Sequence, residues 1–176
     1  FLETLVNNDI AALNDLKNSI SSEAIEQAVT LLQEAETIYV LGQLRSFSVA
    51  YNIRYLLLYL RQNVRLLDGS GGLATEEAEL MSEKSLLVAV SFRYYAREVV
   101  DIVEGTARKN IPILAITDSQ LSPLNKHATC SLVVPGAGHK FSYSLAATMC
   151  LAQSLIISMA SRLEIEGSEE ELNPQD

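Results

Sequence analysis

Polar side chains stand where short apolar runs of this chain come to an end. Ser85–Phe92 carries Ser91 next to its last residue, and Ile111–Thr117 is followed directly by Asp118 and Ser119. Such runs predict buried strands, and the carboxyl ends of parallel strands meet at one edge of the sheet, where open sheets bind their ligands. We therefore expect the functional site at these strand ends.

A cationic and aromatic stretch follows the first of these runs. Arg93 and Arg97 are one helical turn apart, and Tyr94 and Tyr95 lie between them. Because a guanidinium can donate two parallel hydrogen bonds to an anion, this stretch favours an anionic, partly planar or polyhydroxylated ligand. We predict ligand contact for Arg93 and Tyr94, whereas Arg97 is expected to pair with Asp101 and Tyr95 to pack against a neighbour.

A third polar position is Ser46, which follows Gly42 and stands where a helix is expected to begin. A serine there is expected to be the N-cap of the helix. The same place, with its free backbone N–H groups, suits a phosphate, and the two roles are compatible. Arg45 lies in the same loop and belongs to the predicted ligand site.

The remaining candidates are weaker. Ser119 could contact a ligand or belong to a turn before Pro123, and His139 could contact a ligand at the same edge or lie free on the surface. His127 and Cys130 do not have the spacing of a zinc site, so we predict no metal and no cofactor.

The elements that must position these residues alternate between strand and helix. Expected strands are 37–42, 63–68, 85–92, 111–117 and 130–134, and expected helices are 8–20, 22–35, 46–61, 74–82, 95–109 and 141–163. Alternation of this kind predicts an α/β fold, a three-layer αβα arrangement around a five-stranded parallel sheet of flavodoxin-like order. The helices 46–61 and 141–161 are apolar nearly all round, so we expect at least a homodimer that buries part of them.

Charge and composition limit the partners. The net charge is −9, and residues 164–176 hold six acidic side chains and no basic one, so we expect a disordered acidic tail there. An acidic body without clustered Lys and Arg argues against direct binding of nucleic acid. The uncharged stretch 141–161 is long enough to span a bilayer, but its many hydroxyl groups favour a buried helix and no membrane. Cys130 and Cys150 are expected to be buried free thiols of the cytoplasm.

The order of these pieces resembles a known family. The segments Ile38–Gly42 with Ser46, Val88–Ser91 before a helix, and Ala115–Ser119 with Leu121–Leu124 look like the sugar isomerase (SIS) domain of RpiR-type bacterial transcriptional regulators. The resemblance covers about residues 36–163. Residues 1–35 resemble the helical linker that follows an amino-terminal helix-turn-helix domain in these regulators, so we expect this chain, which starts at Phe1, to be a piece of a longer protein.

The resemblance implies a phosphorylated sugar as effector, bound at the carboxyl edge of the sheet, and DNA contact only through the missing amino-terminal domain. The family commonly has a Ser-x-Ser-Gly-x-Thr pattern in the second ligand loop. Here Ser91 matches, while Arg93, Tyr94 and Ala96 replace the second Ser, the Gly and the Thr. In the first loop Leu44 replaces a glycine. The altered second loop leaves phosphate binding there open.

Two alternatives to an effector-sensing domain remain. A phosphosugar aldose–ketose isomerase needs a general base, and Glu76, Glu77 and Glu98 are the carboxylates near the expected edge. None of them stands out, so we predict no catalytic residue and binding without turnover. The other alternative is an oligomerisation module with a degenerate ligand site.

Overall fold

One parallel sheet forms the centre of the molecule. The computed structural model describes residues 1–134, 138–139 and 142–172, with side chains for residues 1–134 and 144–164. Five parallel strands run in the order β2-β1-β3-β4-β5. They are β1 (Thr37–Gly42), β2 (Val64–Leu67), β3 (Ser85–Val90), β4 (Ile113–Thr117) and β5 (Cys130–Val133). This is the flavodoxin-like order, and the predicted fold class is confirmed.

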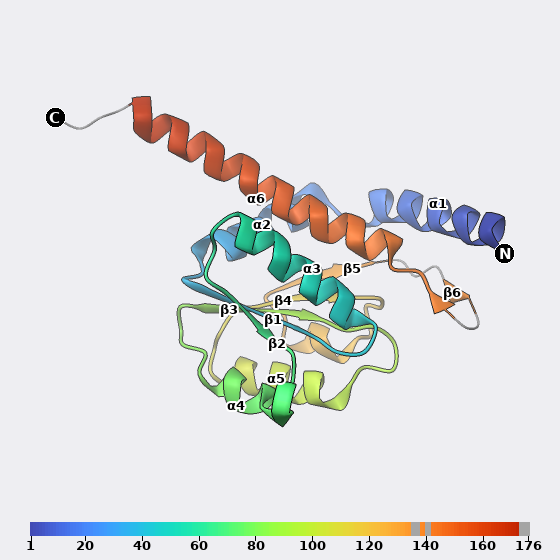
Figure 1. Ribbon diagram of the computed structural model, residues 1–176, viewed down its shortest axis with the longest axis horizontal. Helices are drawn as coiled ribbons and strands as arrows, with labels where there is room; N and C mark the ends of the chain where they lie inside the picture. The colour runs from blue at the N-terminus through green and yellow to red at the C-terminus, as the bar shows by residue number, and fades with distance from the viewer. Residues whose placement is uncertain (135–137, 140–141, 173–176) are drawn as a thin grey trace.

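Helices cover both faces of the sheet (Figure 1). One face carries α2 (Ser22–Glu34), α3 (Ser46–Tyr59) and α6 (Ala146–Leu172), and the other carries α4 (Ala74–Glu79) and α5 (Arg97–Arg108). The first helix, α1 (Leu2–Ser19), packs on α6. Short elements complete the chain: the 3-10 turns η1 (Ser70–Gly72) and η2 (Pro123–Lys126), and an antiparallel pair of β6 (Gly138–His139) and β7 (Ser142–Tyr143).

The apolar strands divide their side chains between two cores. In β3, Leu86 and Val88 face the core under α2, α3 and α6, whereas Leu87 and Ala89 face the core under α4 and α5. All six residues of β3 are buried. Because alternate residues of a strand point to opposite faces, a continuous apolar run is what a strand covered on both faces requires.

The last helix differs from its prediction at both ends. It begins at Ala146 rather than at residue 141, because residues 142–143 pair as β7 and the Ser144 hydroxyl accepts the Ala146 N–H at 3.1 Å. It continues to Leu172, within the segment for which we predicted a disordered tail. Residues 173–176 lie outside the described part of the chain.

Part of this helix has the length and composition of a membrane span. Within the described residues, Ala146–Glu164 is one such candidate, and 39% of its apolar window is buried inside the protein. The helix contacts α1, α2 and α3. A core helix of a soluble protein meets the same criteria, so this single helix is weak support for a membrane location.

The two cysteines lie in different surroundings. Cys130 on β5 is buried, and burial raises the pKa of its thiol. Cys150 is exposed, so its predicted burial is wrong. It lies on the outward side of α6, next to Leu151 and Ala152, which face the core.

Candidate functional site at the carboxyl edge

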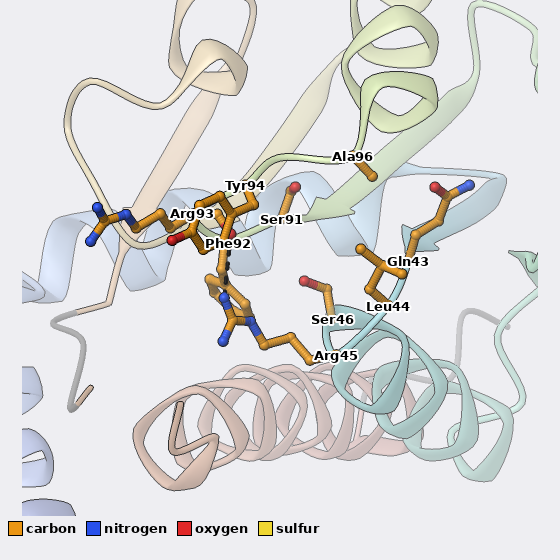
Figure 2. A pocket seen from close by; sticks show the side chains of 9 residues that line it. All are labelled: Gln43, Leu44, Arg45, Ser46, Ser91, Phe92, Arg93, Tyr94 and Ala96. Atoms are coloured by element: carbon orange, nitrogen blue, oxygen red, sulfur yellow. Dashed lines mark hydrogen bonds between the residues drawn. The ribbon is translucent and has the colours of Figure 1, made fainter. Parts of the chain in front are cut away.

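The loops after β1 and β3 meet at the carboxyl edge of the sheet. These strands are neighbours, and Gly42 at the end of β1 is in register with Val90 at the end of β3. The strand order reverses at this pair, which is where open α/β sheets form a ligand crevice. A cavity of about 260 Å³ lies there (Figure 2). Its lining comes from both loops: Gln43, Leu44, Arg45, Ser46, Ser91, Phe92, Arg93, Tyr94 and Ala96.

Gly42 allows the first loop to turn directly into α3. A Cβ on Gly42 would lie 2.7 Å from the carbonyl oxygen of Ser46 and 2.9 Å from the Cβ of Ala50. Real Cβ atoms do not approach other atoms so closely, so the first turn of α3 can pack against the strand end only if residue 42 has no side chain. This packing places Ser46 beside the end of β3.

Two serine hydroxyls face the same gap in the cavity. Ser46 and Ser91 are each 4% exposed, and their hydroxyl groups point towards the space between the two loops (Figure 2). Among the residues that the structure describes, no hydrogen bond is found for either hydroxyl, and neither oxygen is one of the fully buried atoms without a partner, so both oxygens are accessible from the cavity. Because both oxygens are accessible from the cavity and unbonded, this pair is available to a ligand.

Ser46 is not the N-cap that its position predicted. The N-cap is Arg45, and no side chain caps this helix. Instead, the N–H groups of Ser46 and Phe47 donate to the carbonyls of Gln43 and Leu44 at 3.0 and 3.2 Å. Because this tight turn satisfies the first N–H groups, the hydroxyl of Ser46 is not needed as a cap.

Two arginines line the cavity: Arg45 connects the two loops, and Arg93 lies beside them. Nη2 of Arg45 donates to the carbonyl oxygen of Arg93 at 3.3 Å, which ties the first loop to the second. The guanidinium of Arg93 lies 5.5 Å from the centroid of the Tyr94 ring. In Figure 2 it extends away from the hydroxyls of Ser46 and Ser91. Arg93 is exposed, so its side chain is free of packing that would prevent it from turning towards the cavity.

Asp118 holds the second loop from the end of the neighbouring strand β4. Its carboxylate accepts hydrogen bonds from the backbone N–H of Arg93 and from the hydroxyl of Tyr95, both at 2.9 Å. Burial, followed by the hydrogen bond and the charge of Asp118, raises the pKa of the Tyr95 phenol. The carboxylate does not line the cavity, so its role here is to position the loop.

The other predicted residues lie elsewhere. Ser119 belongs to a turn in which its hydroxyl accepts the Leu121 N–H at 3.1 Å, and it does not line the cavity. Arg97 pairs with Asp101 at 3.7 Å, as expected. The side chain of His139 lies outside the described residues.

Sequence reasoning missed the contact between Gln43 and Glu98. The Gln43 amide donates to the carboxylate of Glu98, in the first turn of α5, and so connects the first loop to the helix after the second. The residues are far apart in sequence, and only the adjacency of β1 and β3 could have suggested the pair. Within the described part of the chain, no three side chains of His, Cys, Asp and Glu gather as a metal site would need.

Comparison with known proteins adds to this geometry. The family model of the SIS domain matches residues 31–158. The sugar isomerase domain of an RpiR transcription factor from Sphaerobacter thermophilus is 29% identical, with a TM-score of 0.88 over 92% of this chain and 90% of that one. The NanR protein of Vibrio vulnificus, solved with ManNAc-6P, is 23% identical, with a TM-score of 0.82 over 97% of this chain and 66% of that one.

Curated relatives are longer than this chain. An uncharacterised HTH-type transcriptional regulator, YfhH of Escherichia coli, is 28% identical over 158 residues, which are 89% of this chain and 55% of the relative. A bifunctional protein glk of Burkholderia thailandensis is 27% identical over 129 residues, 73% of this chain and 20% of the relative. The chain thus spans about half of one relative and a fifth of the other.

Proposed function

Because the chain belongs to the SIS domain family, we propose that it is the effector-sensing domain of a transcription regulator. The predicted resemblance to the SIS domain of RpiR-type regulators is confirmed by the sequence and structural relatives. The effector would be a phosphorylated sugar or a related anionic sugar derivative. The complex of the NanR neighbour with ManNAc-6P supports this class of ligand.

The pair of unbonded hydroxyls of Ser46 and Ser91, which are accessible from the cavity, carries this proposal. A phosphate oxygen between them would accept two hydrogen bonds that the protein leaves unmade. Hydrogen bonds to a charged group contribute about 1.5–3 kcal/mol each. Arg93, on the same loop, adds a cation that can turn from the Tyr94 ring towards the anion.

Binding without turnover is the function that these side chains favour. Glu98 is engaged by the amide of Gln43, and Glu76 and Glu77 are exposed on α4. An isomerase would need a general base within hydrogen-bond reach of the sugar carbons. NMR of a phosphosugar incubated with the protein tests this alternative, since aldose–ketose conversion would show an enzyme.

The remaining parts of the proposal concern the whole protein. DNA contact would come from a helix-turn-helix domain outside this chain, as the HTH-type relative suggests. The cytoplasm is the compartment of such regulators. A homodimer would bury the apolar groove of about 410 Å³ between α3 and α6, where Ile157 is 68% exposed.

The deciding experiment is ligand binding by matched serine variants. A thermal-shift screen compares ManNAc-6P and other sugar 6-phosphates with the same sugars lacking phosphate, and calorimetry then gives affinities. Ser46→Ala and Ser91→Ala should each weaken binding by about tenfold, because one charge-assisted hydrogen bond is lost. Ser85→Ala is the control, since Ser85 is equally buried but begins β3 at the opposite edge.

Two arginine variants test the second loop. Arg93→Ala should weaken binding by about tenfold or more, whereas Arg97→Ala should change it little, because Arg97 pairs with Asp101. If Ser46→Ala and Ser91→Ala bind as well as the wild type, the cavity is not an anion site. If the wild type itself binds none of the screened ligands, an oligomerisation module without a ligand becomes the better explanation.

A further inference from the structure

Within the described part of the chain, four residues other than glycine have a left-handed backbone conformation. They are Leu44, Arg61, Tyr94 and Asn110, with φ of 54°, 57°, 70° and 57°. This conformation brings the Cβ of an L-residue close to the following carbonyl, so it favours glycine and is tolerated by asparagine. A bulky residue held there needs a local explanation.

Two of the four are explained by helix ends. Arg61 follows α3, where its N–H donates to the carbonyl of Leu58 and the next N–H, of Gln62, donates to that of Leu57. Asn110 follows α5 in the same way. Its N–H donates to the carbonyl of Ala107, and the next N–H, of Ile111, donates to that of Thr106. These are Schellman ends of helices, in which a left-handed residue is expected.

Leu44 and Tyr94 do not follow a helix: Leu44 precedes the N-cap of α3, Arg45, and Tyr94 lies two residues before the N-cap of α5, Ala96, so neither belongs to a Schellman end. Each lies in one of the two loops that line the cavity. Their side chains are among the most exposed apolar ones, at 79% for Leu44 and 81% for Tyr94. Neither side chain is therefore held in place by burial, and packing in the core does not explain the choice of a large residue.

These two side chains flank the anion-binding hydroxyls. In Figure 2 Leu44 lies on one side of the gap between Ser46 and Ser91, and Tyr94 lies on the other, with its ring beside the side chain of Arg93. A ring compound attached to a phosphate in this gap would extend past both of them. An aromatic ring and a branched aliphatic side chain at the mouth of a pocket suit the apolar face of such a compound.

We propose that Leu44 and Tyr94 form an apolar rim that contacts the ring of a phosphorylated ligand and selects ring phosphates over phosphate alone. The inference rests on the proposed anion site, and it names two specificity-determining residues of that site. The side chains take up strained positions because their place at the mouth, rather than their packing, is what they contribute.

Phenyl phosphate and inorganic phosphate are suitable probes. Both carry the anion, but only phenyl phosphate has an apolar ring. The ratio of their affinities therefore measures how much the contact of the ring with Leu44 and Tyr94 contributes to binding. Affinities come from protein-observed NMR titration, which detects weak binding. Tyr94→Asn and Leu44→Asn remove the apolar side chains and keep a residue that tolerates the left-handed backbone. Arg61→Asn is the matched control at a left-handed position far from the cavity in the sequence.

The wild type should bind phenyl phosphate more tightly than inorganic phosphate, and Arg61→Asn should preserve the ratio. Tyr94→Asn should reduce the affinity for phenyl phosphate by about fivefold and Leu44→Asn by about threefold, with inorganic phosphate unchanged within about twofold. The Tm of both variants should stay the same or rise by about 2 °C, since strain is relieved.

Different results separate the rim from the anion site. If the wild type binds inorganic phosphate but phenyl phosphate no better, the rim is refuted while the proposed function stands. If Tyr94→Asn weakens both probes equally, Tyr94 acts through Arg93, whose guanidinium lies on its ring, and the rim is also refuted. If neither probe binds the wild type, the anion site itself is refuted, and the rim with it.

Discussion

Replacing Asp118 by alanine should loosen the second ligand loop and destabilise the protein. The carboxylate joins the end of β4 to the loop after β3 through two hydrogen bonds of 2.9 Å, from the N–H of Arg93 and the hydroxyl of Tyr95. Asp118→Ala removes both. The loop would then keep its two ends, the hydrogen bond from Arg45 to the Arg93 carbonyl, and the contacts of the Tyr95 hydroxyl with Ser122 and Thr117.

The expected loss follows from the kind and exposure of these bonds. A hydrogen bond to a charged group contributes about 1.5–3 kcal/mol, and a value below this range applies here because the bond from Arg93 is exposed and that from Tyr95 is only partly buried, so that solvent screens the charge. Allowing about 1 kcal/mol for each, Asp118→Ala should lower the free energy of unfolding by about 2 kcal/mol. For a chain of this length that corresponds to a Tm lower by about 4–8 °C.

A double-mutant cycle with Tyr95→Phe isolates one of the two bonds. Tyr95→Phe alone should cost about 1 kcal/mol, but much less when Asp118 is already alanine, so the coupling energy should be about 1 kcal/mol. Asp101→Ala is the control, since this aspartate takes part in an exposed ion pair with Arg97 and should cost less than about 0.5 kcal/mol. Urea unfolding monitored by circular dichroism gives all four values.

The same bond should depend on pH in the alkaline range. The pKa of Tyr95 is raised above its ordinary value of 10.0, first by burial and then by Asp118. A raised pKa in the folded state means that the stabilisation is complete below about pH 10 and is lost as the pH rises through the folded pKa. The stability difference between wild type and Tyr95→Phe should thus be constant up to about pH 10 and shrink above it.

Either of two outcomes would refute the role of Asp118. Asp118→Ala could cost no more than Asp101→Ala, or the cycle could give a coupling below about 0.3 kcal/mol, the usual error of additivity. Either result would mean that the carboxylate does not hold the loop. A normal affinity for sugar phosphates in Asp118→Ala would show, in addition, that the loop needs no support from β4.

Two further predictions concern the sheet edge and the helical face. Gly42→Ala should lower the free energy of unfolding, measured by urea denaturation, by about 1–3 kcal/mol. The reason is that the new Cβ overlaps the carbonyl of Ser46 and the Cβ of Ala50. An unchanged free energy of unfolding would contradict this. Ile157→Glu should weaken a homodimer at least about tenfold in sedimentation equilibrium, since a charge replaces an apolar contact. Leu121→Glu, at a more exposed apolar residue in a loop, should not. A wild type that sediments as a monomer would contradict the second.

The fold could be predicted from the sequence because each strand is an apolar run bounded by polar residues. A run such as Ser85–Val90 is buried along its whole length. In a domain of this size, a central strand of a sheet covered on both faces is the position that such a run fits best. Helix ends were harder to predict. The start of α6 is determined by the pairing of residues 138–139 with 142–143 and by the Ser144 hydroxyl, which no apolar periodicity reveals.

The site was predicted less completely, since its contacts join residues from different strands. Ser46, Arg45, Ser91, Arg93 and Tyr94 do line one cavity, as their positions after β1 and β3 suggested. Their ligand contacts stay predictions.

The role of Asp118 as an anchor depends on the distance between two loops, and spacing along the chain does not show it. The engagement of Glu98 by Gln43 was missed for the same reason.

The altered glycine positions show what a motif comparison leaves out. Judged by residue type, Leu44 and Tyr94 break the pattern of the two ligand loops and weaken the case for a ligand. The backbone at both positions is nevertheless left-handed, as a glycine would allow. With this backbone Ser46 and Ser91 face the same gap, and Leu44 and Tyr94 are two exposed side chains beside it (Figure 2). On the proposed function, a departure from the motif that leaves the backbone left-handed would change which molecule the site selects, rather than remove the site.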